Sequence, residues 1–481
     1  MNDTTGRAET TRRTFLEVLE RHRRDFDRPS SEAYWSESLE TASRDELTAI
    51  QNDKLAALTP FLYENSRFYR RRFDSLGLLP SDIQSLDDLS KWPVVTSREM
   101  AEDAAAHPPF GTYSTMTEDV WTARGWMTFS TSGTSGRPRL FRFSHIDRQY
   151  MEWQNARALY AMDIRARDTV MLVGGFGPHV WHWGVTFALA RLGAAMVPGG
   201  GLDAHGRARL IDRFRPTVLA CTPSYAFHLG RVMKEEGFDP AASSVNTLFL
   251  GGEPAMGIPH TRARLAELWG ARVTEFFGCT EAAPAAGGFG CTAQPDSGPV
   301  IWTHMMEDGQ IWELVDPQTY APVAPGTRGV LVCTNLHSES APQLRFLVGD
   351  YTVFDYARCD CGRTHLRAMG CMMGRADDVI NLRGIKMFPS QIEDAVRAIP
   401  GLGEEYEVVL STDAHGLDIM TVRVEHGDYL TPDAVTRRLV DAVRAECEVR
   451  VGVEVLAPGT LAKTEFKAKR IRDRRNKTAG G

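Results

Sequence analysis

The chain has 481 residues, of which 43% are hydrophobic and 24% are charged, and it carries a formal net charge of −7. Its length exceeds that of one ordinary domain, and its composition is typical of a soluble globular protein. The acidic balance argues against a general nucleic-acid binder, which needs a basic surface. No run of about 18 apolar residues occurs, so no membrane span is expected.

The first 33 residues are polar and charged, and we expect them to be loosely held. Within them, Arg12-Arg13 with the nearby Phe15 has the form of a twin-arginine export signal. The residues after Leu16 are mainly charged where such a signal needs an apolar stretch, so an amphipathic helix is predicted instead. Eight cysteines without an export signal indicate the reducing cytoplasm, with thiols that are free or bound to metal.

The middle of the chain alternates strands and helices. Leucines near helical spacing predict helices between about Tyr34 and Phe73. From about residue 165 onward, short apolar runs end at Gly, Pro or Ser and are separated by helical stretches, which favours βαβ units and an α/β fold with mainly parallel sheets flanked by helices. Ligands of such sheets bind at the carboxyl ends of the strands. The predicted strands cover 169–173, 218–221, 248–250 and 273–277.

The pattern changes near Gly374, and a small α+β unit of roughly 100 residues is predicted after it. Ser390 with Glu393 predicts a capping box for a helix over 391–399. Alternating strands are predicted at 406–411 and 417–425, and Thr431-Pro432 predicts the start of a second helix.

Residues 131–138 read Thr-Ser-Gly-Thr-Ser-Gly-Arg-Pro. Glycines let backbone N–H groups approach an anion, hydroxyls add donors, and Arg137 adds charge, so the loop predicts a polyphosphate site. It differs from a Walker A loop, because G-x-x-x-x-G-K-[ST] does not occur. A plain surface loop is the alternative.

Several ordered motifs together resemble the adenylate-forming superfamily of acyl-CoA synthetases and ligases, with the phenylacetate-CoA ligase type as the most similar branch. The resemblance runs from about Tyr34 to Arg474. It implies a large AMP-binding domain over 34–376 and a small mobile lid domain over 377–481, with Asp377 as the hinge. The motifs are 64–73, 131–138, Gly252-Glu253-Pro254, 277–281, Gly349-Asp350, 374–384 and 388–393.

The resemblance implies a role for each ATP-binding motif. Gly252, Glu253 and Pro254 would lie at the adenine edge. Phe277 of the Phe-Gly-Cys-Thr-Glu segment would stack on adenine, Thr280 would bond the α-phosphate, and Glu281 would ligate Mg²⁺, a hard cation that prefers carboxylate oxygen. Gly278 and Cys279 lie between these residues. The loop that would hold the β- and γ-phosphates consists of Thr131, Ser132, Gly133, Thr134, Ser135, Gly136 and Arg137.

Three further residues are implied at the ribose and the reacting carboxylate. Asp350 would accept from the ribose hydroxyls, and Arg375 would reach the ribose or phosphates. Lys467 matches the lysine that bridges carboxylate, α-phosphate and ribose, where a cation offsets developing charge. Phe466 stands where the family has glycine, so Lys463 and Lys469 are alternatives to Lys467.

A cysteine cluster implies a second metal. Some members of this branch carry a structural zinc bound by one upstream cysteine, one histidine and a C-x-C pair. By that resemblance the ligands are Cys291, His304, Cys359 and Cys361, a set suited to tetrahedral zinc. His304 lies a few residues after the family position, which is Val300 here. Cys371 is a competing ligand, and free thiols are the alternative.

The segments that would line the acid pocket are rich in aromatic and small residues, which suits an aromatic or related acid. Ordinary packing is the alternative for each side chain. Arg137 in place of the usual lysine and Cys279 inside the motif favour a biosynthetic enzyme with an unusual acid. The predicted pocket residues are His179, Trp181, Tyr225, Phe276, Gly278 and Ala282.

The predicted reaction has two steps: a carboxylate attacks Mg·ATP to give an acyl-adenylate, and coenzyme A then attacks the carbonyl. Gly384 and Lys386 are placed near the coenzyme. A carrier-protein thiol, an amine or nitrite is the alternative acceptor, and a nucleotide-binding homologue with impaired catalysis is the alternative class. A monomer or homodimer is expected.

Overall fold

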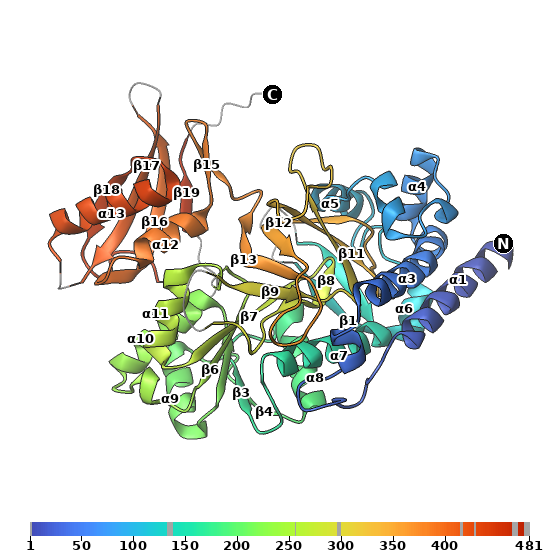
Figure 1. Cartoon of the computed structure of the whole chain (residues 1–481), viewed down its shortest axis with the longest axis horizontal. Coiled ribbons are helices and arrows are strands. Elements are labelled where there is room, and N and C mark those ends of the chain that lie inside the picture. Colours follow the sequence, from blue (N-terminus) through green and yellow to red (C-terminus); the bar gives the residue numbers. More distant parts are fainter. Residues whose placement is uncertain are drawn as a thin grey trace.

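In the computed structural model, the described residues are 2–131, 138–254, 256–295, 300–413, 417–427, 430–463 and 470–475. They form a large N-terminal part and a smaller C-terminal part that lies on the opposite side from the N-terminal helices (Figure 1). The predicted α/β class with a separate α+β unit at the C-terminus is confirmed. Across the described residues, every helix is too short or too polar to cross a bilayer.

Helices dominate the first 124 residues. The chain passes through them before it reaches the first strand, and the two longest, α1 and α3, pack against each other. The elements are α1 (Asn2–Arg21), α2 (Glu37–Glu40), α3 (Arg44–Asn65), α4 (Arg67–Leu76), η1 (Pro80–Asp82), η2 (Leu86–Lys91), α5 (Ser97–Ala106) and α6 (Glu118–Arg124).

Helix α1 corrects the expectation that residues 1–33 are loosely held. Phe15, Val18 and Leu19 are buried, and the rings of Phe15 and Phe61 stack with centroids 4.9 Å apart. These apolar residues lie on one helical stripe, which burial against α3 stabilises. Composition alone hid this, because most of the other α1 residues are polar.

Arg12 fixes α1 to the rest of the large part. Its side chain is 1% exposed, and it donates to Glu339 Oε1 (3.3 Å), Asn65 Oδ1 (3.1 Å) and the Thr115 carbonyl (2.8 Å). Glu339 is also buried and pairs with Arg124 at 3.0 Å. One side chain therefore joins three distant segments.

We expect Arg12→Met to lower the free energy of unfolding by about 3 kcal/mol, because it removes one partner of a buried ion pair. Thermal melting measures the loss. Arg13→Met is the matched control, since Arg13 lies on the exposed side of the same helix and, within the part of the chain that the structure describes, forms its ion pair with Glu17. Equal melting of the two variants would contradict the docking of α1.

The large part is built on a sheet of eleven strands among the described residues, in the order β10-β11-β12-β13-β9-β8-β7-β6-β5-β3-β4. The β4-β3-β5-β6-β7 half is parallel, as the sequence predicts, and the other half is antiparallel. The bounds are β3 (Thr169–Leu172), β4 (Ala195–Pro198), β5 (Val218–Cys221), β6 (Thr247–Gly251), β7 (Arg272–Cys279), β8 (Ala283–Phe289), β9 (Trp302–Met305), β10 (Gln310–Val315), β11 (Gly329–Asn335), β12 (Phe346–Asp355) and β13 (Arg367–Arg375).

Helices cover both faces of the parallel half, which explains why its strands are mainly apolar. Val170 and Leu172 of β3 share a core with α7 and α8, whereas Met171 between them shares a second core with α9, α10 and α11. Alternate residues of a strand face opposite sides, so one short apolar run serves two cores. The helices are α7 (His145–Ala161), α8 (Val180–Leu192), α9 (Ala204–Phe214), α10 (Pro223–Glu235), α11 (Pro259–Trp269) and the short η3 (Pro240–Ala242).

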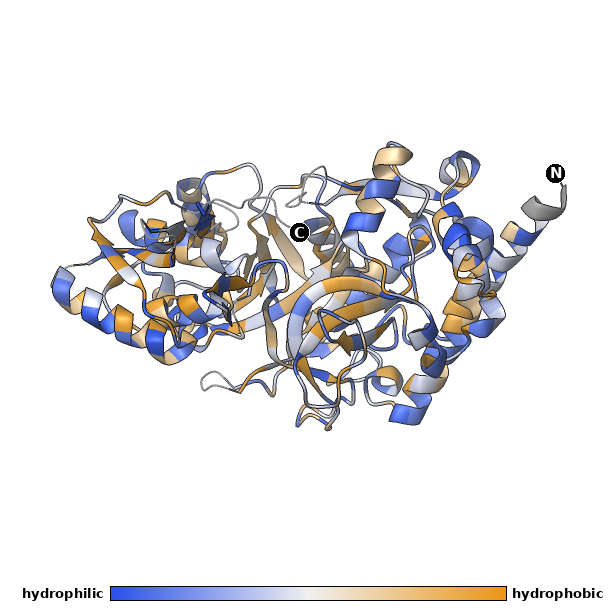
Figure 2. Ribbon diagram, turned by 90° about the horizontal axis from the view of Figure 1, so that it is seen from above, coloured by the Kyte–Doolittle hydropathy of each residue, from blue (hydrophilic) through white to orange (hydrophobic). Residues whose placement is uncertain are grey.

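The C-terminal part has its own hydrophobic core beneath a sheet in the order β18-β17-β16-β19. Hydrophobic and hydrophilic residues alternate along its outer helices in Figure 2, as expected where one helical face is buried. It contacts the large part through α11 and α12, where Asp394 Oδ1 accepts from His260 N (2.9 Å) and Glu393 accepts from Thr261 (3.0 Å). Its elements are β14 (Ile380–Leu382), β15 (Ile385–Met387), α12 (Pro389–Arg397), β16 (Leu402–Thr412), β17 (Asp418–His426), α13 (Pro432–Cys447), β18 (Gly452–Leu456) and β19 (Ile471–Asp473).

One of the two predicted helix starts in this part is wrong. Helix α12 begins at Pro389, and the Gln391 side chain accepts from Phe388 N at 2.9 Å, while Ser390 donates to the Met373 carbonyl. Ser390 lies inside the first turn, so it cannot be the cap. The predicted start of α13 is confirmed, since the Thr431 side chain accepts from Ala434 N.

Candidate active site and metal centre

The predicted phosphate loop joins β1 (Gly125–Ser130) to β2 (Leu140–Ser144), which pair antiparallel. At its base, Thr131 N donates to the Arg139 carbonyl (3.0 Å), and Arg139 N donates to Thr131 Oγ1 (3.0 Å). The loop therefore starts and ends at one point. The predicted loop residues Ser132, Gly133, Thr134, Ser135, Gly136 and Arg137 lie outside the described residues.

Glu281, the predicted Mg²⁺ ligand, lies at this loop base. Its carboxylate forms an ion pair with Arg139, and the two side chains are only 14% and 9% exposed. The pair joins the end of β7 to the start of β2, 142 positions apart in the sequence. Arg139 directly follows the predicted loop, but its position in the sequence alone did not reveal its partner.

The remaining residues of the 276–282 segment differ in exposure. Phe277 packs on Trp312 with ring centroids 6.1 Å apart. Phe276 and Ala282 are buried, and the Ala282 carbonyl accepts from Asn335 Nδ2 at 2.6 Å. Gly278 is exposed, and Cys279 and Thr280 are partly so. The middle of the segment, 278–280, is therefore accessible to solvent, while its ends at Phe276 and Ala282 are buried.

Asp350 and Arg375 are paired residues on the neighbouring strands β12 and β13. Arg375 Nη1 lies 3.8 Å from Asp350 Oδ2, and Arg375 also donates to both carboxylate oxygens of Asp377, at 2.8 and 3.1 Å. Burial lowers the pKa of Arg375, yet its hydrogen bonds to Asp377 and the charge of Asp350 outweigh burial and raise that pKa. The structure therefore brings together the predicted ribose and hinge residues.

Two backbone features support this pair. Gly349 has φ +95°, and a Cβ there would lie 3.3 Å from Arg375 Nη2, so glycine leaves room for the arginine. Behind the site, burial and the charge of Asp350 raise the pKa of Glu275 to about 7, although a hydrogen bond from Met256 N opposes the shift. Sequence analysis missed Glu275 because it is a single acidic residue in a mainly apolar strand.

The predicted adenine-edge segment contacts helix α10. Glu253 accepts from Ser224 N at 3.1 Å, in the first turn of that helix. Gly252 has φ +84°, which glycine adopts without strain. The contact places Gly252, Glu253 and Pro254 at the carboxyl ends of β5 and β6, as the βαβ pattern predicts.

A cavity of about 70 Å³ opens at the carboxyl ends of β3 and β5. Of the predicted acid-pocket residues, Trp181 and Tyr225 line it, whereas Phe276, Gly278 and Ala282 do not. His179 lies nearer the loop base, with Nδ1 3.3 Å from the Ser130 carbonyl. The lining residues are Val173, Gly174, Gly175, Trp181, His182, Arg207, Cys221, Thr222 and Tyr225.

Arg207 is a lining residue that sequence analysis missed. It lies on α9, outside the strand-end motifs, but it follows three glycines at the end of β4. A cation shortly after a glycine run at a strand end is the signal that could have identified it.

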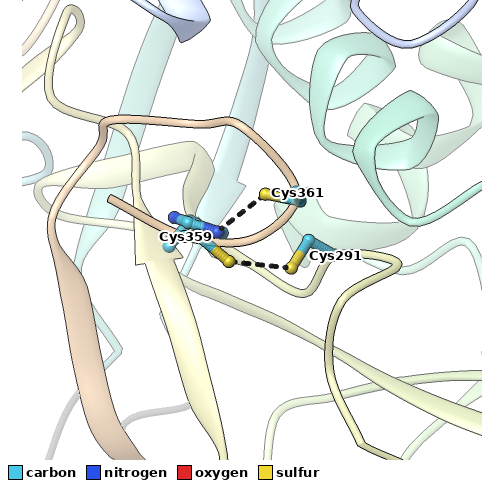
Figure 3. A group of neighbouring side chains, drawn as sticks. Cys291, Cys359 and Cys361 are labelled. Carbon is cyan, nitrogen blue, oxygen red and sulfur yellow. Dashed lines mark hydrogen bonds between the residues drawn. The ribbon is translucent and has the colours of Figure 1, made fainter. Parts of the chain in front are cut away.

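The predicted metal ligands Cys291, His304, Cys359 and Cys361 converge, with all four ligand atoms within 4.8 Å of one another. The three labelled sulfurs point toward a shared space in Figure 3. Cys291 Sγ lies 3.9 Å from Cys359 Sγ, and Cys361 Sγ lies 3.4 Å from His304 Nε2. A tetrahedral zinc needs edges of about 3.8 Å between sulfurs and about 3.5 Å between sulfur and nitrogen.

The hydrogen bonds around this cluster orient its histidine and favour the thiolate form of Cys361, as a bound metal cation requires. His304 Nδ1 lies 3.1 Å from the His365 carbonyl, an arrangement that leaves Nε2 facing the thiols. Hydrogen bonds with Cys291 and Cys359 lower the pKa of Cys361, and the thiolate is the form that binds metal. The competing ligand Cys371 lies outside the cluster, in the core shared with α9, α10 and α11.

The C-x-C turn is fastened to the N-terminal segment. Tyr34 Oη donates to the Cys361 carbonyl at 3.0 Å. A Cβ at Gly362 would lie 2.0 Å from Tyr34 Oη, so glycine leaves room for this hydroxyl. Arg363 pairs with the buried Glu40 at 2.7 Å. A metal in this cluster would therefore hold the N-terminal segment, the C-x-C turn and strand β9 together.

The predicted coenzyme residues lie on the β14–β15 hairpin of the C-terminal part. Gly384 has φ +87° and donates to Asn381 Oδ1, and Lys386 is exposed. Lys463 is exposed as well. Phe466, Lys467 and Lys469 lie outside the described residues.

Comparison with known proteins agrees with these motifs. The AMP-binding enzyme family model matches residues 117–337, and the AMP-binding enzyme C-terminal domain model matches residues 384–475. Phenylacetate-coenzyme A ligase of Thermus thermophilus is 30% identical over 456 residues, which cover 91% of this chain and 98% of that protein.

Solved structures agree in fold. 2-Hydroxyisobutyryl-CoA ligase with 2-HIB-AMP in the postadenylation state is 30% identical, has a TM-score of 0.85, and the match covers 92% of this chain and 93% of that one. The same ligase with 2-HIB-AMP and CoA in the thioesterification state has a TM-score of 0.69 at 30% identity, over 93% and 94% of the two chains. The chain therefore belongs to the adenylate-forming family of AMP-binding enzymes, in the branch of AMP-forming acid–CoA ligases that includes the phenylacetate-CoA ligases.

Proposed function

We propose that the protein converts an aromatic or related carboxylic acid, ATP and coenzyme A into an acyl-CoA, AMP and pyrophosphate, in a biosynthetic role. The observation that carries the proposal is the pairing of distant motif residues at one sheet edge: Arg139 with Glu281, and Asp350 with Arg375. The aromatic lining supports the acid class, and Arg137 and Cys279 support the biosynthetic role. We also propose a cytoplasmic location, since none of the eight cysteines, all within the described residues, forms a disulfide.

In the first step, a carboxylate oxygen attacks the α-phosphorus of ATP, and the bond from that phosphorus to the β-phosphate oxygen breaks, releasing pyrophosphate. Asp350 accepts hydrogen bonds from the ribose hydroxyls, and Arg375 holds Asp350 in place. The 131–137 loop and Thr280 donate to phosphate oxygens. Lys467 offsets the charge that develops between the carboxylate and phosphate anions.

Glu281 is the residue that would hold Mg²⁺. It offers carboxylate oxygen, the donor this ion prefers, in a partly buried position that already attracts a cation, Arg139. When bound, Mg²⁺ would neutralise phosphate charge. Arg139 orients the carboxylate at the loop base.

In the second step, the thiol of coenzyme A loses its proton, its sulfur bonds to the acyl carbon, and the carbon–oxygen bond to AMP breaks. We propose that the C-terminal part first rotates about Asp377, withdrawing Lys467 and bringing Gly384 and Lys386 to the coenzyme. The TM-scores of 0.85 and 0.69 to two states of one relative support this, because the same fold fits one arrangement of the parts better than the other.

Lys467→Ala is expected to slow acid-dependent pyrophosphate release by at least about 100-fold, because it removes a charge needed only in the first transition state. Conversion of supplied acyl-adenylate to thioester should remain near the wild-type rate. Lys463→Ala is the matched control, a lysine four residues earlier. If Lys463→Ala loses pyrophosphate release and Lys467→Ala retains it, the assignment of the catalytic lysine is wrong.

We further propose that Cys291, His304, Cys359 and Cys361 hold a structural zinc ion. The separations of their ligand atoms support this, and so does their position away from the carboxyl ends of the parallel strands. Four protein ligands close the coordination sphere, which is typical of a structural and not a catalytic site.

A further inference from the structure

The cavity at the ends of β3 and β5 contains an unusual positive charge. Arg207 Nε donates to the Gly199 carbonyl (2.9 Å), and Nη1 donates to Tyr225 Oη (2.5 Å). Among the described residues, no carboxylate forms an ion pair with this guanidinium. A partly buried cation whose partners are neutral groups is well suited to bind an anionic or oxygen-bearing group, to which it can donate hydrogen bonds.

Two other polar atoms in the same cavity have no hydrogen-bond partner among the described residues. His182 is 4% exposed, and its Nε2 has no hydrogen-bond partner among the described residues; the same is true of Trp181 Nε1. Burial, together with the charges of His179 and Arg207, lowers the pKa of His182 to about 4, so its ring is neutral at pH 7. Buried polar atoms in native proteins are almost always paired, so these indicate a partner outside the chain.

The position of His182 depends on glycine. A Cβ at Gly174 would lie 1.9 Å from His182 Cε1, so only glycine at the end of β3 allows the ring to lie there. Gly199, which accepts from Arg207, is also close-packed, since a Cβ there would lie 2.9 Å from Met171 Cε. The polar wall of the cavity is therefore built by close backbone packing.

The cavity adjoins the segments that would hold the adenylate. Trp181 packs on Phe249 (6.0 Å between ring centroids), and Phe249 packs on Phe276 (5.7 Å), which precedes Phe277. Helix α10, which supplies Tyr225, contacts Glu253 through Ser224. This side of the sheet edge is where the acyl group of an adenylate would extend.

We propose that the acid carries an oxygen-bearing substituent, a hydroxyl or a second carboxylate, and that Arg207 binds that oxygen and determines specificity. The inference rests on the proposed function and names its substrate class. An acid without the oxygen would leave His182 Nε2 and Trp181 Nε1 unpaired and the Arg207 guanidinium desolvated with only neutral partners, which disfavours that acid strongly. The cavity of about 70 Å³ has room for a group of this size.

The test compares matched acids in acid-dependent pyrophosphate release: benzoate with its ortho, meta and para hydroxy and carboxy derivatives, phenylacetate with its hydroxy derivatives, and propionate with succinate. Wild-type kcat/KM should favour an oxygen-bearing acid over its parent by at least about tenfold. Arg207→Met should bring that ratio near one, and Arg207→Lys should restore part of it. Arg209→Met, on the same helix and paired with Glu236, should leave it unchanged.

Each outcome has a distinct meaning. Turnover of the parent acids with the same ratio in wild type and Arg207→Met overturns the role of Arg207 and leaves the proposed function intact. No pyrophosphate release with any acid contradicts the proposed function, and the inference falls with it. If Arg207→Met fails to fold, Tyr225→Phe removes only the hydroxyl that holds Arg207 and should lower the same ratio; an unchanged ratio overturns the inference.

Discussion

Replacing Glu281 by glutamine is expected to slow acid-dependent pyrophosphate release by about 100-fold or more. The amide keeps the shape of the side chain but removes the negative charge that would hold Mg²⁺ at the phosphates. It also leaves Arg139, which is 9% exposed, without its carboxylate partner. The remaining activity should need a higher Mg²⁺ concentration, because the ion loses one charged ligand.

The matched control is Glu118→Gln. Glu118 also pairs with an arginine near the loop, Arg142, but it is 78% exposed. This change should leave the rate and the Mg²⁺ requirement unchanged, since exposed pairs contribute little. Thermal melting separates catalysis from folding. A stable Glu281→Gln enzyme with the wild-type rate at low Mg²⁺ would contradict the role of Glu281.

Replacing Cys361 by serine is expected to remove zinc from the protein and to lower its melting temperature more than any other single change considered. Structural zinc contributes about 10–16 kcal/mol of binding energy in small zinc-binding peptides, and much of it supports folding. Here the ion would hold Tyr34, the C-x-C turn and His304 on separate segments. Plasma mass spectrometry of freshly purified protein measures the metal content.

Cys371→Ser is the matched control for this change. Cys371 is as buried as the cluster but lies in another core, so its loss should leave the zinc content at one ion per chain. Wild-type protein with well below one zinc per chain would contradict the metal assignment. Loss of zinc from Cys371→Ser, with retention in Cys361→Ser, would contradict the choice of ligands.

The parallel half of the sheet could be predicted because the sequence of each strand, taken by itself, indicates a strand. A short apolar run that ends at Gly or Ser is local information, and β3, β5, β6 and β7 all carry it. The antiparallel half could not be predicted in the same way. Its strands pair across long sequence separations, as β13 does with β9, and no local pattern specifies the partner.

The sequence predicted which motifs form the candidate site, but it did not predict which side chains in the site contact each other. The Asp350–Arg375 pair follows from two motifs that resemble a family, and the register of β12 and β13 then brings them together. The Arg139–Glu281 pair and Arg207 depend on how separate segments pack. Each arginine is a single charge in the sequence, and its burial and its partners result from the packing of those segments.

In the cysteine cluster, part of the ligand set follows from sequence spacing and part depends on the fold. The C-x-C turn is local, so Cys359 and Cys361 could be identified from spacing. The resemblance implied Cys291 and His304 as the other two ligands and left Cys371 as a competitor, and the fold brings Cys291 and His304, but not Cys371, to this turn. Strand β9 carries His304 beside β13, while Cys371 at the middle of β13 lies in the core on the side of α9, α10 and α11.

The central claim, that this protein forms an acyl-adenylate, is tested most directly by acid-dependent exchange of labelled pyrophosphate into ATP without coenzyme A. We predict exchange with at least one acid of the panel, dependent on Mg²⁺ and reduced by Glu281→Gln and Lys467→Ala. AMP should appear in stoichiometric amounts only after coenzyme A is added. Folded protein that shows no exchange with any of these acids would contradict the account.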